Sequence, residues 1–199
     1  MIDPSAVAFV GIAGTLFLAE LTDKDALLLL ALATRTRASR VFLAGAAAFL
    51  FTTAVIVTIG AITISVVPIR WVKLAGGVVM IAYGLWEARG LVGQKTVAEE
   101  EGRIENARGG FRSFLLMVGA LAFLDLAGDA TEVLTIVFVA QYSDALLVFA
   151  AAYAGLLAAT AVETTLGNRL GKFLTPGRIR YLSVSVFLLL GGLILVSSL

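Results

Sequence analysis

The chain has 199 residues, of which 60% are hydrophobic and 15% are charged, and its formal net charge is +1. Its mean hydropathy of +1.00 is far above that of soluble domains, which indicates a protein embedded in a lipid bilayer. Cysteine and histidine are absent, which excludes a disulfide framework and thiolate or imidazole metal sites. Any metal bound by side chains must therefore contact oxygen, which favours hard ions such as Mg²⁺, Ca²⁺ and Mn²⁺.

Apolar segments long enough to cross a bilayer recur along the chain. A spanning helix needs about 20 mostly apolar residues, and the sequence predicts six, at 5–33, 41–66, 71–91, 112–140, 145–167 and 181–198. The first lacks the basic start and small-residue cleavage site of a secretory leader, so we expect it to be retained. The predicted fold class is an all-α polytopic membrane protein with six transmembrane helices.

Basic residues predict the orientation of these spans. The connections on one side hold most of the lysines and arginines, whereas the other side holds only Arg70 and Lys73. Basic loops stay in the cytoplasm, so both termini are predicted to be non-cytoplasmic, in a multi-pass protein of a prokaryotic cell membrane. The scatter of basic residues over short connections gives no reason to expect a nucleic-acid partner, and a homo-oligomer stays open.

The two halves of the chain resemble each other. Residues 53–60 (TAVIVTIG) match residues 160–167 (TAVETTLG) in order and spacing. Each half would hold three spans, an odd number, so the second copy would cross the membrane upside down relative to the first, as in many secondary transporters. We expect one three-helix repeat at 1–91, a charged cytoplasmic linker at 92–110 and the second repeat at 111–199.

Charged residues interrupt the first span at residues 20–25 (ELTDKD). Neither flank is expected to span alone, so these charges would lie within the bilayer, where each costs roughly 2.5–3.5 kcal/mol unless it is paired or lines a polar cavity. Glu20 and Asp23 share a helix face, and Lys24 lies four residues from Glu20, within pairing distance. A salt bridge between Glu20 and Lys24 that only fixes packing, with Asp25 as a further partner of Lys24, is the plainer interpretation.

The fourth span repeats the pattern without a basic partner. Asp125, Asp129 and Glu132 follow one another at spacings of four and three, which places them on one helix face. Inverted repeats would bring this stripe and the first to a common depth, and Gly128 would allow local unwinding. Glu163 is expected near the cytoplasmic end of the fifth span, at the interface or paired with a loop arginine.

The two motifs resemble those of the UPF0016 family, also called the GDT1/TMEM165 family of divalent cation/proton antiporters. Its repeated motif reads Glu-x-Gly-Asp-(Lys/Arg)-(Ser/Thr). In the first copy Glu20, Asp23 and Lys24 match, whereas Thr22 replaces the glycine and Asp25 the hydroxyl residue. In the second copy the matching residues are Gly128, Asp129 and Thr131, Ala130 replaces the basic residue, and Leu126 holds the glutamate position.

The resemblance implies export of Mn²⁺ or Ca²⁺ from the cytoplasm in exchange for protons, with Glu20, Asp23 and Asp129 as metal ligands. It implies neither an enzyme nor a tightly bound cofactor. Our own inference adds Asp125, as a substitute for the displaced glutamate. The predicted ligand set is Glu20, Asp23, Asp125, Asp129, Thr22 and Thr131, and the residues predicted to couple protons or to support the ligands are Lys24, Asp25 and Glu132.

Two other functions stay open. A small amine or amino-acid exporter of similar architecture would also use buried acids. An intramembrane aspartyl protease needs two membrane-embedded aspartates and a Gly-x-Gly-Asp motif, of which residues 126–129 (LAGD) retain the second half. The number of acidic residues argues against a two-aspartate dyad.

Overall fold

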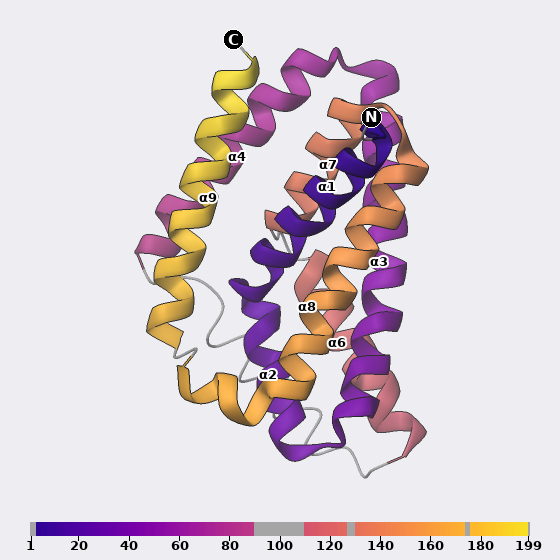
Figure 1. The fold of residues 1–199 in the computed structure, drawn as a ribbon, viewed down its shortest axis with the longest axis vertical. Helices are drawn as coiled ribbons and strands as arrows, with labels where there is room; N and C mark the ends of the chain where they lie inside the picture. The colour runs from indigo at the N-terminus through magenta and orange to yellow at the C-terminus, as the bar shows by residue number, and fades with distance from the viewer. Residues whose placement is uncertain (1–2, 90–109, 127–129, 174–175, 199) are drawn as a thin grey trace.

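The computed structural model describes residues 3–89, 110–126, 130–173 and 176–198, and all of these segments are helical or short connections (Figure 1). The N-terminal end of α1 and the C-terminal end of α9 lie at the same end of the long axis of the molecule (Figure 1). In chain order the helices are α1 (Pro4–Leu21), α2 (Lys24–Arg35), α3 (Ala38–Val66), α4 (Ile69–Ala88), α6 (Phe111–Leu126), α7 (Ala130–Tyr142), α8 (Ala145–Phe173) and α9 (Pro176–Ser198).

Length and composition identify the candidate membrane spans among the described residues. α1, α3, residues 69–86 of α4 and residues 145–165 of α8 each qualify, and α6 with α7 forms a fifth if this pair, bent by 63°, is one broken span. The apolar part of α9, Val184–Ser198, falls short of the required length. The all-helical membrane architecture is thus confirmed, whereas the count of six spans and the orientation of the termini stay predictions.

Both acidic motifs lie where a helix is interrupted. α1 ends at Leu21 and α2 begins at Lys24, while α6 ends at Leu126 and α7 begins at Ala130. The predicted flank before the motif ends at Ala19, but α1 continues through Glu20 and Leu21 of the motif itself. With Asp3 capping its first turn and Pro4 at the first helical position, α1 reaches 18 residues and qualifies by itself.

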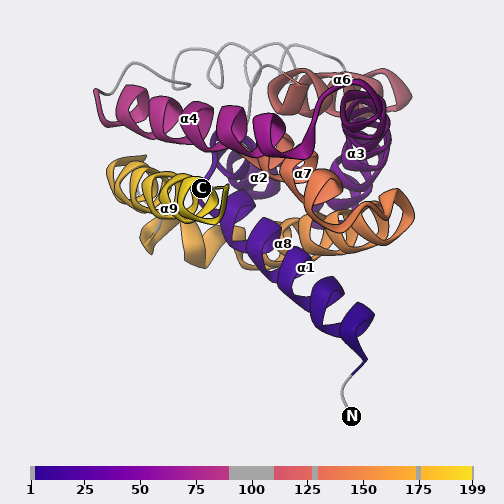
Figure 2. The ribbon, with the colours of Figure 1, turned by 90° about the horizontal axis from the view of Figure 1, so that it is seen from above.

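The helix pairs of the first half match those of the second half. α1 packs on α8 as α6 packs on α3, and α2 packs on α8 as α7 packs on α3, while α4 pairs with α9 and α3 with α8 (Figure 2). Exchanging the first four helices for the last four leaves these pairings unchanged. This is the packing that a two-repeat chain with a pseudo-two-fold axis would produce.

Two buried apolar clusters flank the acidic motifs. In the first broken helix, Ile12 and Leu16 before the break belong to one cluster, and Leu28 and Leu32 after the break belong to the other. In the second broken helix this order is reversed: Leu121 and Leu124 precede the break and Leu134 follows it. The carboxylates therefore occupy a polar layer between two apolar layers.

Candidate cation site

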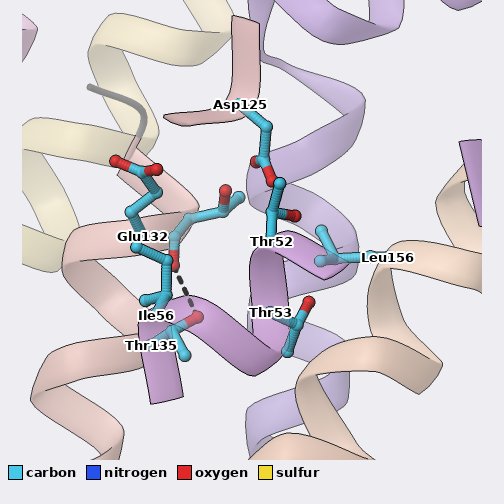
Figure 3. Close-up of a pocket in the computed structure, with 8 residues that line it drawn as sticks. Thr52, Thr53, Ile56, Asp125, Glu132, Thr135 and Leu156 are labelled. Carbon is cyan, nitrogen blue, oxygen red and sulfur yellow. Dashed lines mark hydrogen bonds between the residues drawn. The ribbon is translucent and has the colours of Figure 1, made fainter. Parts of the chain in front are cut away.

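A pocket lies at the junction of α6 and α7, beside the middle of α3 (Figure 3). It holds two carboxylates, Asp125 from the last turn of α6 and Glu132 from the first turn of α7. Four hydroxyls complete the polar lining, and two apolar side chains close it. The described lining residues are Thr52, Thr53, Ile56, Asp125, Thr131, Glu132, Thr135 and Leu156.

The helix ends position these groups. Asp125 comes down from α6 toward Thr52 of α3, while Glu132 rises from the start of α7 (Figure 3). The Thr135 hydroxyl donates to the Thr131 carbonyl oxygen at 2.7 Å, so this hydroxyl satisfies a backbone acceptor within its own helix. The Asp125 side chain is 3% exposed, which makes the pocket a place where a carboxylate is held away from bulk solvent.

Thr53 contributes a hydroxyl that is free to bind a ligand. Its Oγ1 atom is buried and has no hydrogen-bond partner within the described part of the chain. The neighbouring Thr52 hydroxyl instead donates to the Phe49 carbonyl oxygen at 3.4 Å. A buried hydroxyl without a partner is destabilising, so the Thr53 oxygen is an available ligand atom in a pocket that two carboxylates also line.

The chemistry of this lining suits a small, hard cation. The pocket is small, with a volume of about 10 Å³ for the centre of a water-sized sphere, and its polar atoms are the carboxylate and hydroxyl oxygens that Ca²⁺, Mg²⁺ and Mn²⁺ prefer. Among the described lining residues none is basic or aromatic. Of the predicted ligands, the structure therefore brings Asp125 and Thr131 together, and Glu132 joins them.

The first motif forms a more tightly packed region. Glu20 and Asp25 are completely buried, Asp23 is 2% exposed, and none of the three lines the pocket described above. Thr22 ends α1, where its hydroxyl donates to the Ala19 carbonyl oxygen at 2.9 Å. The Asp23 amide donates to the Glu20 carbonyl oxygen at 3.0 Å, so backbone bonds fix the break between α1 and α2.

Some predicted site residues fall outside the description. Gly128 and Asp129 lie in the segment that the structure leaves out, and Lys24 begins α2 with its side chain undescribed. Within the described ranges, no three acidic side chains stand close enough together to hold one metal ion. The predicted ligand set as a whole therefore stays a prediction.

The structure corrects the expectation for Glu163. This side chain was predicted to reach the interface or a loop arginine, but it is completely buried in α8. Sequence reasoning placed it by counting from the end of a span at residue 167, whereas α8 continues to Phe173. Thr52, Thr53 and Thr135 were also missed as lining residues. The internal match between residues 53–60 and 160–167 was the available signal, since it contains both Thr53 and Glu163.

Comparison with known proteins gives one match. A family model described as divalent cation/proton antiporter GDT1 matches residues 8–94 and 114–199, covering the chain as two repeats. No curated protein and no solved structure matches the chain. The resemblance seen in the two acidic motifs is thereby confirmed.

Proposed function

Because the chain belongs to the GDT1 family of divalent cation/proton antiporters, we propose that it exports Mn²⁺, Ca²⁺ or both from the cytoplasm in exchange for protons. Both ions bind carboxylate and hydroxyl oxygens. The observation that carries this proposal is the pocket at the α6–α7 junction, which the buried Asp125 and the half-buried Glu132 line together, with the partnerless Thr53 hydroxyl beside them.

Competition for the same oxygens supplies the coupling. A carboxylate buried away from water is stabilised either by a proton or by a cation, and leaving it charged without either is costly. A divalent ion that enters from the cytoplasm displaces protons from the pocket. When the pocket faces the opposite, more acidic side, protons rebind the carboxylates and release the ion.

Broken helices at both motifs support alternating access. The interruptions between α1 and α2 and between α6 and α7 lie at equivalent places in the two repeats, and interrupted helices at a repeat interface are where secondary transporters bind their cargo. In this mechanism Glu20, Asp23, Asp129 and Thr22 contribute ligands from the first motif and from the undescribed segment. Lys24 and Asp25 adjust the charge of the site as protons move.

The membrane arrangement completes the proposal. We retain six spans in two inverted repeats, at 1–91 and 111–199, joined by a cytoplasmic linker at 92–110. Both termini are non-cytoplasmic, in a prokaryotic cell membrane. The start of α1 and the end of α9 lie at one end of the molecule (Figure 1), which supports two termini on the same side of the membrane.

A rival cargo is a small organic amine or amino acid. The described pocket argues against it, because an organic cation needs apolar or aromatic surface for its carbon atoms, and only Ile56 and Leu156 supply any. The aspartyl-protease alternative is set aside, because the family is one of transporters.

Flux measurements with purified protein in liposomes test the proposal. Mn²⁺ or Ca²⁺ uptake should follow an imposed pH gradient, and Asp125→Asn should abolish it. The matched control is Asp144→Asn, which removes an exposed acid whose Oδ1 atom accepts a hydrogen bond from the Leu147 amide at 3.0 Å. No flux of either metal through folded wild-type protein, with competition by small amines instead, would establish the rival cargo.

A further inference from the structure

Glu163 is a buried acid that the proposed pocket does not use. It lies on α8 with no solvent exposure, and within the described residues neither of its carboxylate oxygens has a hydrogen-bond partner. The nearby threonine hydroxyls are committed elsewhere: Thr160 donates to the Leu156 carbonyl oxygen at 2.8 Å and Thr164 to the Thr160 carbonyl oxygen at 2.7 Å. A bare buried carboxylate is destabilising, so a packing role does not account for Glu163.

The register of α1 against α8 places Glu163 at the depth of the first acidic motif. The two helices run in the same direction (Figure 1) and pack along their length. A methyl group added at Gly155 would meet the Ala13 carbonyl oxygen, so the two backbones touch at this level. Glu20 follows Ala13 by seven residues and Glu163 follows Gly155 by eight, which brings both acids to a similar depth, about 10–12 Å further along the helices.

The two repeats give Glu163 a counterpart in the described pocket. In the match between residues 53–60 and 160–167, Ile56 corresponds to Glu163. In the match between the two motifs, Glu132 corresponds to Ala26. Ile56 and Glu132 face the same pocket from α3 and α7, and α8 packs on α2 as α3 packs on α7. At these positions the second motif has its carboxylate on the short helix, with Glu132 in α7 and Ile56 in α3. The first motif has its carboxylate on the long helix, with Glu163 in α8 and Ala26 in α2.

We propose that Glu163 and Glu20 form a second cation-binding half-site, which takes a divalent cation at the first motif as Asp125 and Glu132 do at the second. Because no three acidic side chains among the described residues stand close enough to share an ion, this half-site consists of two carboxylates. This inference rests on the proposed antiport for its biological meaning. Its chemical content, binding of a divalent cation by Glu163, does not depend on transport.

Two measurements on the full-length protein test the assignment. Mn²⁺ binding to purified protein is followed by the electron paramagnetic resonance signal of free Mn²⁺, and Mn²⁺ flux is followed in liposomes. Glu163→Gln keeps the shape of the side chain and should weaken Mn²⁺ binding by roughly tenfold or more, the range already seen when a group that only supports a metal ligand is lost. Flux should fall with it. Asp144→Asn, which changes the exposed residue directly before α8, should change neither.

A relocated carboxylate separates cation binding from a merely structural role. Glu163→Ile should lose Mn²⁺ binding at this half-site. Adding Ala26→Asp places an acid on the opposite wall, in the first turn of α2, where the helix dipole favours negative charge. The double variant Ala26→Asp/Glu163→Ile should recover at least part of the lost binding. A folded double variant that does not recover Mn²⁺ binding would contradict the half-site.

The outcomes also separate this inference from the proposed function. Wild-type flux that Asp125→Asn abolishes and Glu163→Gln leaves intact, with unchanged Mn²⁺ binding, would overturn the half-site and leave the antiporter standing. Wild-type protein without flux would refute the antiporter, and weaker Mn²⁺ binding by Glu163→Gln would still establish the half-site. Wild-type protein that neither binds nor transports Mn²⁺ would overturn both.

Discussion

The two broken helices carry versions of one motif and differ in how they are built. At the α1–α2 break, three acids are buried, and two turns before the break the α1 backbone touches α8 at Ala13. At the α6–α7 break, Asp125 and Glu132 line an open space with a free hydroxyl opposite them. Exchanged helix pairings relate the two regions, so the difference arises from side chains rather than from topology. The first motif is thus closely packed, whereas the second lines a small pocket.

Asp125→Asn should have the largest effect on transport. The change keeps the size of the side chain and removes one of the two charges that line the described pocket. We expect the initial rate of pH-driven Mn²⁺ uptake to fall about 100-fold or more, since groups that merely support a metal ligand already contribute roughly 10–100-fold in affinity. Retention of more than half the wild-type rate would remove the pocket from the mechanism.

Glu20→Gln tests whether the first acidic motif contributes to transport as well. If both halves handle the cation, uptake should fall by roughly tenfold, the lower end of the range for groups around a metal. The comparison is made with Asp3→Asn, because Asp3 is an exposed acid at the other end of the same helix. A Glu20 variant with normal uptake and normal stability would mean that the first motif only fixes packing.

Gly155→Ala probes the close contact that distinguishes the first half. The new methyl group would meet the Ala13 backbone, which neither helix can relieve without moving. We expect a destabilisation of about 1–3 kcal/mol, typical of overpacking, measured as a lower thermal unfolding temperature in detergent. Gly119→Ala in α6 is the matched control, because no atom lies within 4 Å of the added methyl group. Equal stability of the two variants would contradict the tight α1–α8 packing.

Thr53→Val should have the smallest effect. It should lower the affinity for the cation without lowering the stability of the protein. Valine fills the same space without the partnerless hydroxyl, so stability should hold or rise, while cation affinity falls by about fivefold for the loss of a contact worth roughly 1 kcal/mol. Thr63→Val on the same helix removes an exposed hydroxyl that donates to the Ile59 carbonyl oxygen at 2.7 Å and should leave affinity unchanged. A destabilised Thr53 variant with normal affinity would assign the hydroxyl a structural role.

The sequence predicted the helical membrane fold because hydropathy and spacing act locally. Apolar runs, the helix breaks at the acidic motifs and the family likeness were all visible in contiguous residues. The polar layer could be anticipated in part, because the spacing of Asp125 and Glu132 predicted that they lie close together. The structure places them on two helices, α6 and α7, and not on one face of a single helix.

The partners from distant helices could not be predicted in the same way. Thr53 and Ile56 reach the pocket only because α3 crosses the α6–α7 junction, and residue spacing does not encode that crossing. Glu163 was misplaced for a related reason: its depth is set by the contact between Gly155 and Ala13 and not by its distance from a span end. The match between residues 53–60 and 160–167, which aligns Ile56 with Glu163, was the sequence signal that linked the two positions.

The central claim is that protons and a divalent cation compete for the same buried carboxylates. The most direct test adds Mn²⁺ to purified protein in a weakly buffered detergent solution and follows the pH with an indicator dye. The account predicts proton release that saturates with Mn²⁺ binding and is lost in Asp125→Asn, while Asp144→Asn behaves as wild type. Mn²⁺ binding without any proton release, across the pH range in which the protein is folded, would contradict it.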